Sequence, residues 1–323
     1  MKIALIHHTD NDGLMSGYLF WLYYKRQITD GNAVLIPYSY EKEADWMENP
    51  EYTKFVFGDI TPPVEWLIKN QSRIENYEIV VTIYDHHRPK YEEIQNNFLG
   101  VEHIQFEFDD RKSGCKIIFD NMVFDEYKLL SILVDFVSDY DTWLFTQPDY
   151  EGINTPIRSY YKNDVLAFNT YMKLSTNLPD WIDKINMLFI DGITPDKTYI
   201  FYEQIRNSIK MGNILLKQIS VDNEHTVKKG KYLRKEKAFF YSGYPNYDLL
   251  ETIQKTYSDV LYWIGFEFDL QKNIVSFSIR SIVDGSDVIA KNLGGGGHKK
   301  AGGAKVEISK GMMLIQNPTW FFD

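Results

Sequence analysis

The stretch Tyr84-Asp85-His86-His87-Arg88-Pro89 follows directly after the apolar run Ile79-Val80-Val81-Thr82-Ile83. A short run of apolar and β-branched residues is typical of a strand that is buried inside a parallel sheet. The acid and the two imidazoles are therefore expected where this strand ends. Open α/β sheets bind their ligands at that carboxyl edge, so the pattern predicts a functional site there.

Two other apolar runs end in the same kind of polar loop. Residues 2–6 lead into His7-His8-Thr9-Asp10-Asn11-Asp12-Gly13, and residues 54–57 lead into Gly58-Asp59. If the three strands lie side by side, their carboxylates and imidazoles meet at one edge of the sheet. Like charges that meet in one cleft repel one another and raise their own pKa values unless cations separate them. We therefore predict bound divalent metal.

The first of these loops is the strongest candidate for metal binding. His8, Asp10 and Asp12 occupy alternate positions, which places them on one side of an extended segment. His7 would point to the other side and is interpreted as structural. Oxygen and nitrogen donors without cysteine suit hard or borderline divalent ions. Asp59 taken alone is more typical of a turn residue, because Gly-Asp is a common turn pair.

The composition limits the classes of function. The chain has 323 residues, of which 44% are hydrophobic, and its 45 acidic and 35 basic residues give a formal net charge of -10. This charge argues against broad binding to duplex nucleic acid, but a metal ion can still attract a small anionic substrate. The single cysteine fits a reducing compartment, and no stretch approaches the ~20 apolar residues that span a bilayer. We expect a soluble, cytoplasmic protein with no membrane partner.

The length and the pattern of strands and helices predict more than one domain. Residues 1–146 alternate strand and helix, which predicts an α/β domain with a parallel sheet and flanking helices. Residues 147–237 are interpreted as a helical connector, and residues 238–323 as a smaller α+β domain. The connector ends in the basic segment 228–237. A solvated linker or hairpin is the favoured interpretation of that segment, and contact with a phosphate backbone is the alternative.

A glycine-rich motif, Gly294-Gly295-Gly296-Gly297-His298-Lys299-Lys300, stands near the end of the chain. Four consecutive glycines are not expected to form a stable helix or strand interior. A backbone without Cβ atoms can instead wrap an anion with its N–H groups, beside an imidazole and two ammonium groups. A flexible loop is the alternative interpretation.

The motifs of this chain, and the order in which they follow one another, resemble those of the DHH phosphoesterase superfamily. The resemblance rests on His8-x-Asp10-x-Asp12, on Asp59, on Asp85-His86-His87, and on a later acid that is Asp139 or Asp141. Residues 276–281 followed by GGGGHKKAGG resemble the DHHA1 substrate-binding domain, with Gly302 where a second alanine is common. The resemblance covers both ends of the chain and implies an N-terminal DHH catalytic domain followed by a C-terminal DHHA1 domain.

The resemblance also implies a pair of divalent cations, with Mn²⁺ as the first choice and Mg²⁺ as the alternative. His8 and Asp10 would hold one ion, Asp12, His86 and the late acid would hold the other, and Asp59 would bridge them. Asp139 is preferred as the late acid because it follows a small residue at the end of an apolar helix. His87 would contact a phosphate oxygen or orient the metal ligands, and Asp85 would fix the neighbouring imidazoles. The residues expected to bind the substrate are Arg280, Ser281, Gly295, Gly296, Gly297 and His298.

The implied function is a two-metal phosphodiesterase or exonuclease, since two metals can activate water and clamp phosphoryl oxygens. The expected partner is short single-stranded nucleic acid or a related small nucleotide. A cyclic-dinucleotide or phosphoadenosine-phosphate phosphohydrolase is the alternative enzyme, and a non-catalytic nucleotide-binding relative is the alternative outside enzymology.

Overall fold

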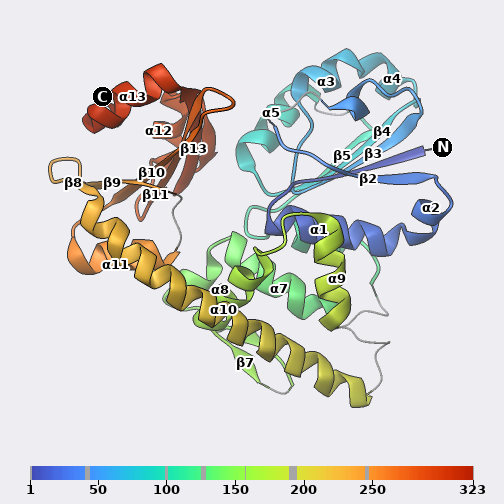
Figure 1. The fold of residues 1–323 in the computed structure, drawn as a ribbon. Coiled ribbons are helices and arrows are strands. Elements are labelled where there is room, and N and C mark those ends of the chain that lie inside the picture. Colours follow the sequence, from blue (N-terminus) through green and yellow to red (C-terminus); the bar gives the residue numbers. More distant parts are fainter. Residues whose placement is uncertain are drawn as a thin grey trace. The chain divides into compact units, whose positions relative to one another are not determined.

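The computed structural model describes residues 2–40, 44–98, 101–124, 129–156, 158–188, 195–243 and 247–322. The chain forms two compact units, Met1–Asn213 and Ile214–Asp323, and the boundary falls within the long helix α10 (Pro195–Lys229) (Figure 1). No helix in the described part of the chain has the length and apolar character needed to cross a membrane. The three-part division at residues 146 and 237 remains a prediction.

The first unit is built on a five-stranded parallel sheet with the strand order β2-β1-β3-β4-β5. Its strands are β1 (Lys2–His7), β2 (Ala33–Pro37), β3 (Tyr52–Gly58), β4 (Val80–Asp85) and β5 (Ile104–Phe108). The three strands that precede the polar loops are adjacent: β3 lies between β1 and β4. Because all three run in the same direction, their polar loops leave from the same edge of the sheet. The predicted α/β fold class is confirmed.

Helices cover both faces of this sheet. On one side lie α3 (Val64–Lys69), α4 (Gln71–Glu75) and α5 (Arg88–Phe98), and α1 (Asn11–Tyr23) lies on the other (Figure 1). Contacts with α1 hold α6 (Gly114–Asn121) and α7 (Leu130–Asp141) on its side. The unit also contains α2 (Lys25–Thr29), α8 (Lys162–Met172), α9 (Leu178–Leu188), and the two-stranded pair β6 (Ile153–Asn154) and β7 (Ser159–Tyr160).

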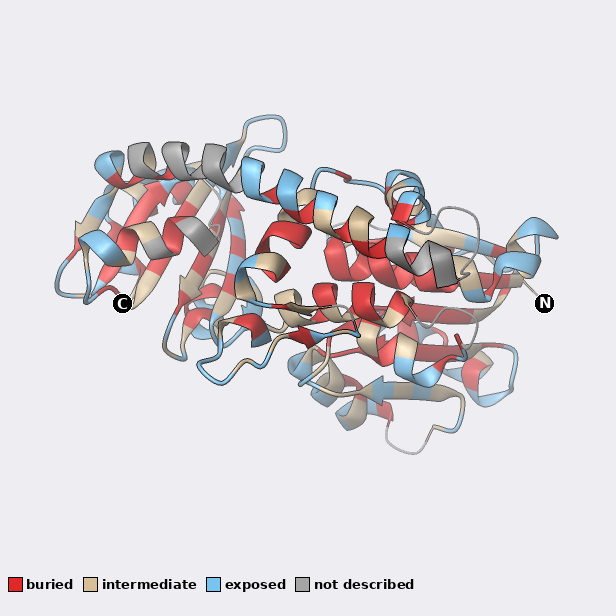
Figure 2. Ribbon diagram, turned by 90° about the horizontal axis from the view of Figure 1, so that it is seen from below, coloured by how far each residue is buried: buried red, intermediate tan, exposed pale blue. Residues whose placement is uncertain are grey.

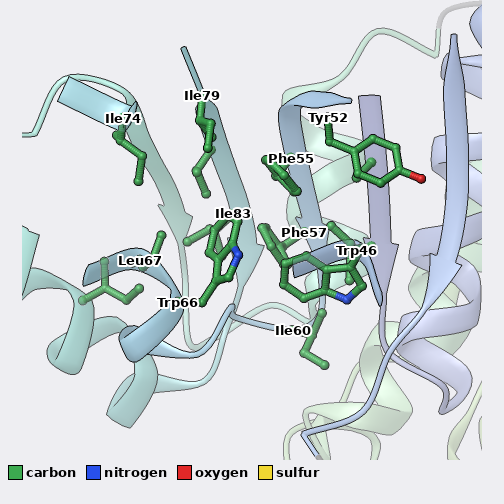
Figure 3. Close-up of a cluster of buried hydrophobic side chains, with 14 of the residues drawn as sticks. Trp46, Tyr52, Phe55, Phe57, Ile60, Trp66, Leu67, Ile74, Ile79 and Ile83 are labelled. Carbon is green, nitrogen blue, oxygen red and sulfur yellow. The ribbon is translucent and has the colours of Figure 1, made fainter. Parts of the chain in front are cut away.

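An aromatic core anchors the strands whose ends carry the polar loops. Trp46 and Trp66 lie 5.3 Å apart between ring centroids, and both contact Phe55 and Phe57 of β3. These side chains, together with Ile83 of β4, form one buried cluster (Figure 3). Large buried aromatic side chains contribute much of the apolar burial in a core. The packing therefore anchors β3 and β4 just before Asp59 and Asp85.

The second unit is built on a six-stranded mixed sheet with the order β12-β13-β11-β10-β9-β8. Its strands are β8 (Lys231–Leu233), β9 (Ala238–Ser242), β10 (Tyr262–Asp269), β11 (Ile274–Ser281), β12 (Gly296–His298) and β13 (Ala301–Glu307). The helices are α11 (Tyr247–Thr256), α12 (Ser286–Asn292) and α13 (Ile308–Gln316). In each unit the buried residues line the sheet and the inner sides of the helices (Figure 2). A C-terminal α+β domain is therefore confirmed.

The glycine run departs from the expectation that it forms no strand. Gly296–His298 pair with Ala301–Gly303 as the short edge strand β12. A Cβ atom at Gly295 would lie 2.0 Å from the carbonyl oxygen of Gly303, and Gly297 has a φ of 135°. The absence of side chains therefore lets two backbones approach closely, and glycine is needed because the segment is a tight strand edge.

Candidate metal centre

The loop after β1 is tightly folded. Asp10 caps α1, with its Oδ1 accepting a 2.9 Å hydrogen bond from the Gly13 N–H. A Cβ atom at Gly13 would lie 2.3 Å from the His8 carbonyl group, so only glycine allows the chain to turn here. The expected extended alternation through Asp12 is wrong, because Asp12 already lies in the first turn of α1. The capping turn nevertheless brings Asp12 back toward the other acids.

Asp59 has a strained backbone at the end of β3. Its φ of 57° lies in the left-handed region, which is uncommon for residues other than glycine. Its N–H donates to the Tyr84 carbonyl oxygen at 2.9 Å, which ties it to β4. The start of α6 lies close behind it, since a Cβ at Gly114 would come within 2.6 Å of the Asp59 Cα and Cβ. Strain of this kind persists where the surrounding structure enforces it, often at functional sites.

The two carboxylate oxygens of Asp59 face two different imidazoles. Its Oδ2 lies 3.6 Å from His8 Nδ1, and its Oδ1 lies 3.4 Å from His86 Nε2. His8 Nδ1 is also 3.0 Å from Asp10 Oδ2. Several groups of possible ligands have their donor atoms within 4.8 Å of one another, among them His8, Asp10 and Asp59, and Asp12, His86 and Asp141.

The donor set fits divalent cations. Both oxygens of Asp59 are buried and accept no hydrogen bond within the described part of the chain. Burial, followed by the charges of Asp12 and Asp10, raises the pKa of Asp59 well above its usual value. An unpaired buried carboxylate among other acids is costly unless a cation compensates it. The buried His and Asp side chains are therefore compatible with the binding of divalent metal ions.

The late acid in this cluster is Asp141. Its Oδ2 lies 3.3 Å from His86 Nε2, and burial, followed by Asp12, raises its pKa well above the usual value. Asp139 instead accepts a 2.6 Å hydrogen bond from the Tyr150 hydroxyl and lines a separate pocket with Asp135 and Asp149. The geometry therefore favours Asp141, the alternative to Asp139, as the late acid, and metal binding by either remains a prediction. Residues two apart on a helix point about 200° apart, so α7 can direct only one of the two acids to the cluster.

Asp12 is held by a helix terminus that the sequence analysis did not identify. Its Oδ2 accepts the Gly114 N–H at 2.7 Å and its Oδ1 accepts the Cys115 N–H at 2.8 Å. Both donors belong to the first turn of α6, where backbone N–H groups lack partners within the helix. The signal in the sequence was Ser113 at the N-cap followed by Gly114, a start pattern for a helix.

Asp85 fixes the two histidines that follow it. Its Oδ1 accepts the backbone N–H groups of His86 at 2.8 Å and His87 at 3.2 Å, and lies 2.6 Å from His87 Nδ1. Burial opposes a charged imidazole, but the carboxylate of Asp85 and other acids outweigh it and raise the pKa of His87 to about 9. Thr61, which the sequence analysis also missed, donates its hydroxyl to Asp85 Oδ2 at 2.5 Å.

His7 is a core residue. It is fully buried, its Nδ1 lies 2.8 Å from the His8 carbonyl oxygen, and its ring packs against Gly17 of α1, where a Cβ would come within 2.9 Å. Burial lowers its pKa to about 4. This environment agrees with the structural role that the sequence indicated.

No family model matches the chain, and no curated protein matches it. Among solved structures, the pGpG-specific phosphodiesterase PggH from Vibrio cholerae is 12% identical, with 99% of each chain covered and a TM-score of 0.45. An exopolyphosphatase-related protein from Bacteroides fragilis is 11% identical, with 98% of this chain and 91% of that chain covered and a TM-score of 0.45. Exonuclease RecJ bound to manganese is 12% identical, with 99% and 88% covered and a TM-score of 0.46.

The substrates and the metal named for these three solved structures belong to those proteins. For this chain, the decisive observation is that the His8, Asp59, Asp85-His86-His87 and Asp141 motifs, in the DHH order, converge at one edge of a parallel sheet. This arrangement agrees with the resemblance to the DHH phosphoesterase superfamily that these motifs carry.

The DHHA1-like motifs lie in the second unit. Arg280, on β11, donates from Nη1 to the carbonyl oxygens of Ile279 at 3.0 Å and Gly302 at 3.3 Å. Gly295 precedes the edge strand β12, which contains Gly296, Gly297 and the exposed His298. Substrate binding by these residues remains a prediction.

Ser281 has a different environment. Its hydroxyl is buried, 2.5 Å from the Val283 carbonyl oxygen and 2.7 Å from the Ser286 hydroxyl. These contacts hold the loop before α12. They occupy the Ser281 hydroxyl, so the geometry does not support substrate binding by Ser281.

Proposed function

We propose that this protein is a two-metal phosphoesterase that hydrolyses short oligonucleotides or a related small nucleotide. The observation that carries the proposal is the position of Asp59, whose two buried oxygens face His8 on one side and His86 on the other. A carboxylate in this position suits a bridge between two cations. Nitrogen and carboxylate donors together favour Mn²⁺, with Mg²⁺ as the alternative.

Each ion has its own set of ligands in this proposal. His8 and Asp10 would hold the first ion, Asp12, His86 and Asp141 would hold the second, and Asp59 would be available to both. Asp12 already accepts two backbone N–H groups, and each carboxylate oxygen retains further lone pairs for a metal. When bound, a metal pair lowers the pKa of water and neutralises charge on phosphoryl oxygens.

The protein itself positions the substrate and supplies a positive charge. His87, with a pKa of about 9, is charged at neutral pH and is suited to pair with a phosphate oxygen. Asp85 holds that imidazole by its Nδ1, so the ring keeps one orientation. In the second unit, Arg280, the amides of Gly295–Gly297 and His298 are proposed as substrate-binding residues. Phosphoryl transfer depends mainly on such positioning and charge neutralisation.

The acidic composition supports a short substrate. A net charge of -10 disfavours long duplex nucleic acid, whose binding is driven by basic surfaces. Linear dinucleotides and short single strands are therefore proposed first, and phosphoadenosine phosphate and cyclic dinucleotides are the alternatives that a substrate panel must compare.

The test combines metal binding and turnover. Metal-free protein is titrated with Mn²⁺ by calorimetry and is assayed on a labelled dinucleotide and on the panel, beside Asp59→Asn and the control Asp139→Asn. We expect the wild type and the control to bind two ions and to turn over substrate. In Asp59→Asn, metal binding and turnover should both be reduced. Two bound ions without turnover of any substrate would indicate a nucleotide-binding relative, and failure to bind metal would refute the proposal altogether.

A further inference from the structure

The basic segment 228–237 lies beside an open pocket of the second unit. The segment contains six basic residues and one acid, in a chain with a net charge of -10. It comprises the end of α10, the strand β8 and the turn into β9. The pocket has a volume of about 610 Å³, and Lys229 and Lys231 are among its lining residues. This volume lies within the range of about 300–1,000 Å³ that is usual for ligand pockets.

The pocket has an apolar base. Phe240 of β9 and Phe266 of β10 stack with ring centroids 5.1 Å apart and an interplanar angle of 23°. Phe266 and Ile315 of α13 are only partly buried, so some of this apolar surface is accessible. The hydroxyl-bearing Ser242 is exposed and also lines the pocket. A flat aromatic surface of this kind can stack a nucleic-acid base.

The backbone directs the lysines to this pocket. Lys231 pairs with Phe240 across the antiparallel β8–β9 ladder, so the two side chains project from the same face of the sheet. Gly230 lets the end of α10 approach β9, since a Cβ there would lie 2.2 Å from the Phe239 ring. Lys229 and Lys231 are exposed, and no carboxylate in the described part of the chain forms an ion pair with either. Their charge is therefore available to an anion.

We infer that this pocket is a second binding site, specific for single-stranded nucleic acid. The lysines would take successive phosphates of one strand, and a base would stack at the exposed part of Phe266. Aromatic surface beside two lysines suits a strand whose bases are unpaired. This inference shares the substrate class of the proposed function but involves none of the metal ligands.

Binding of the full-length protein to a fluorescent hexathymidylate tests the inference. Anisotropy is measured in EDTA, which removes divalent metal, so that hydrolysis of the oligonucleotide does not affect the result. The variant Lys229→Glu/Lys231→Glu should bind at least tenfold more weakly. The slope of log K against log salt should be shallower for this variant than for the wild type by about 1.4. Two phosphate contacts are lost, and each contact on a single strand contributes about 0.7. The control Lys255→Glu/Lys310→Glu makes the same change of net charge at exposed positions of α11 and α13.

A second pair of variants tests the stacking. Phe266→Leu keeps an apolar side chain and should weaken binding of hexathymidylate about fivefold or more, but not of an abasic strand of equal length. Phe268→Leu, two residues further along β10 and 43% exposed, is the matched control. Photocrosslinking with a bromouracil strand should label the 226–243 or 262–269 peptides.

Several results would overturn the inference. If Lys229→Glu/Lys231→Glu and Lys255→Glu/Lys310→Glu weaken hexathymidylate binding equally, only the net charge of the protein determines the affinity. If the wild type binds inorganic polyphosphate as tightly as hexathymidylate, and if Phe266→Leu binds hexathymidylate as tightly as the wild type, the pocket is a general polyanion site. Wild-type protein that fails to bind the oligonucleotide would exclude the site directly.

Discussion

The hydroxyl of Thr61 donates a 2.5 Å hydrogen bond to Oδ2 of Asp85, a buried carboxylate whose other oxygen faces His87. The backbone N–H of Thr61 in turn donates to the Tyr40 hydroxyl oxygen at 3.0 Å. The loop after β3 is thus connected to the residues that end β4. In the described part of the chain, Thr61 forms no hydrogen bond with the group of His8, Asp10 and Asp59 or with the group of Asp12, His86 and Asp141, so it acts by holding Asp85.

Replacement of Thr61 by valine should reduce kcat about 10- to 100-fold, the usual loss when a group that orients metal ligands is removed. Valine has nearly the same shape, so the loss would come from the missing hydroxyl. Steady-state kinetics on a dinucleotide measure the effect, and Thr61→Ser should restore most of the rate. If valine and serine variants turn over equally, the hydroxyl does not position Asp85.

Asp141 and Asp139 offer a matched comparison within one helix. Asp141→Asn should weaken Mn²⁺ binding at least tenfold, because it removes a charged donor 3.3 Å from His86. Asp139→Asn should leave Mn²⁺ affinity within about threefold, since Asp139 contacts Tyr150. Calorimetric titration of both variants measures the difference. A larger loss in Asp139→Asn would reverse the assignment.

This pair also shows what the sequence could and could not predict. Apolar runs before His8, Asp59 and Asp85 predict strands, and the common direction of parallel strands brings their ends together, so the convergence of these three residues was predictable. The choice between Asp139 and Asp141 depends on where α7 ends and on its rotation, which a local pattern does not determine.

Contacts between segments that are distant in the sequence could not be predicted from the sequence either. Thr61 and the N–H groups of Gly114 and Cys115 reach the site only through tertiary packing. The strand β12 was missed because glycine is unfavourable in strands in general, whereas here close approach to β13 requires it.

Gly114 is the point where α6 meets Asp59. An alanine there would place its Cβ 2.6 Å from the Asp59 Cα and Cβ, so the backbone would have to move. Gly114→Ala should lower the free energy of unfolding by about 1–3 kcal/mol and should weaken metal binding. Gly296→Ala, with no atom within 4 Å of the added Cβ, is the control for urea unfolding. Equal destabilisation of both variants would contradict the close contact.

His7 predicts a specific dependence of stability on pH. Its pKa is about 4 in the fold because it is buried, and about 6.5 when unfolded. Between these values the unfolded chain binds more protons, so stability falls as pH decreases. From pH 7 to pH 5 the loss from this residue should be about 2 kcal/mol.

Urea unfolding of metal-free wild type and His7→Gln at the two pH values isolates this contribution, because the other titrating groups are common to both proteins. The wild type should lose more stability than the variant. If the two proteins lose the same amount, His7 does not stay neutral in the fold.

Asp59 should have opposite effects on the metal-free and the metal-bound protein. Without metal, burial and the neighbouring acids disfavour its charged form, so Asp59→Asn should raise the melting temperature at pH 7 in EDTA. With metal, the wild type gains stability by binding ions only in the folded state, and the variant has lost the carboxylate that faces both ligand groups. Adding Mn²⁺ should therefore raise the melting temperature of the wild type much more than that of Asp59→Asn. A variant that is less stable than the wild type in EDTA, yet responds equally to Mn²⁺, would show that Asp59 serves the fold and not the metals.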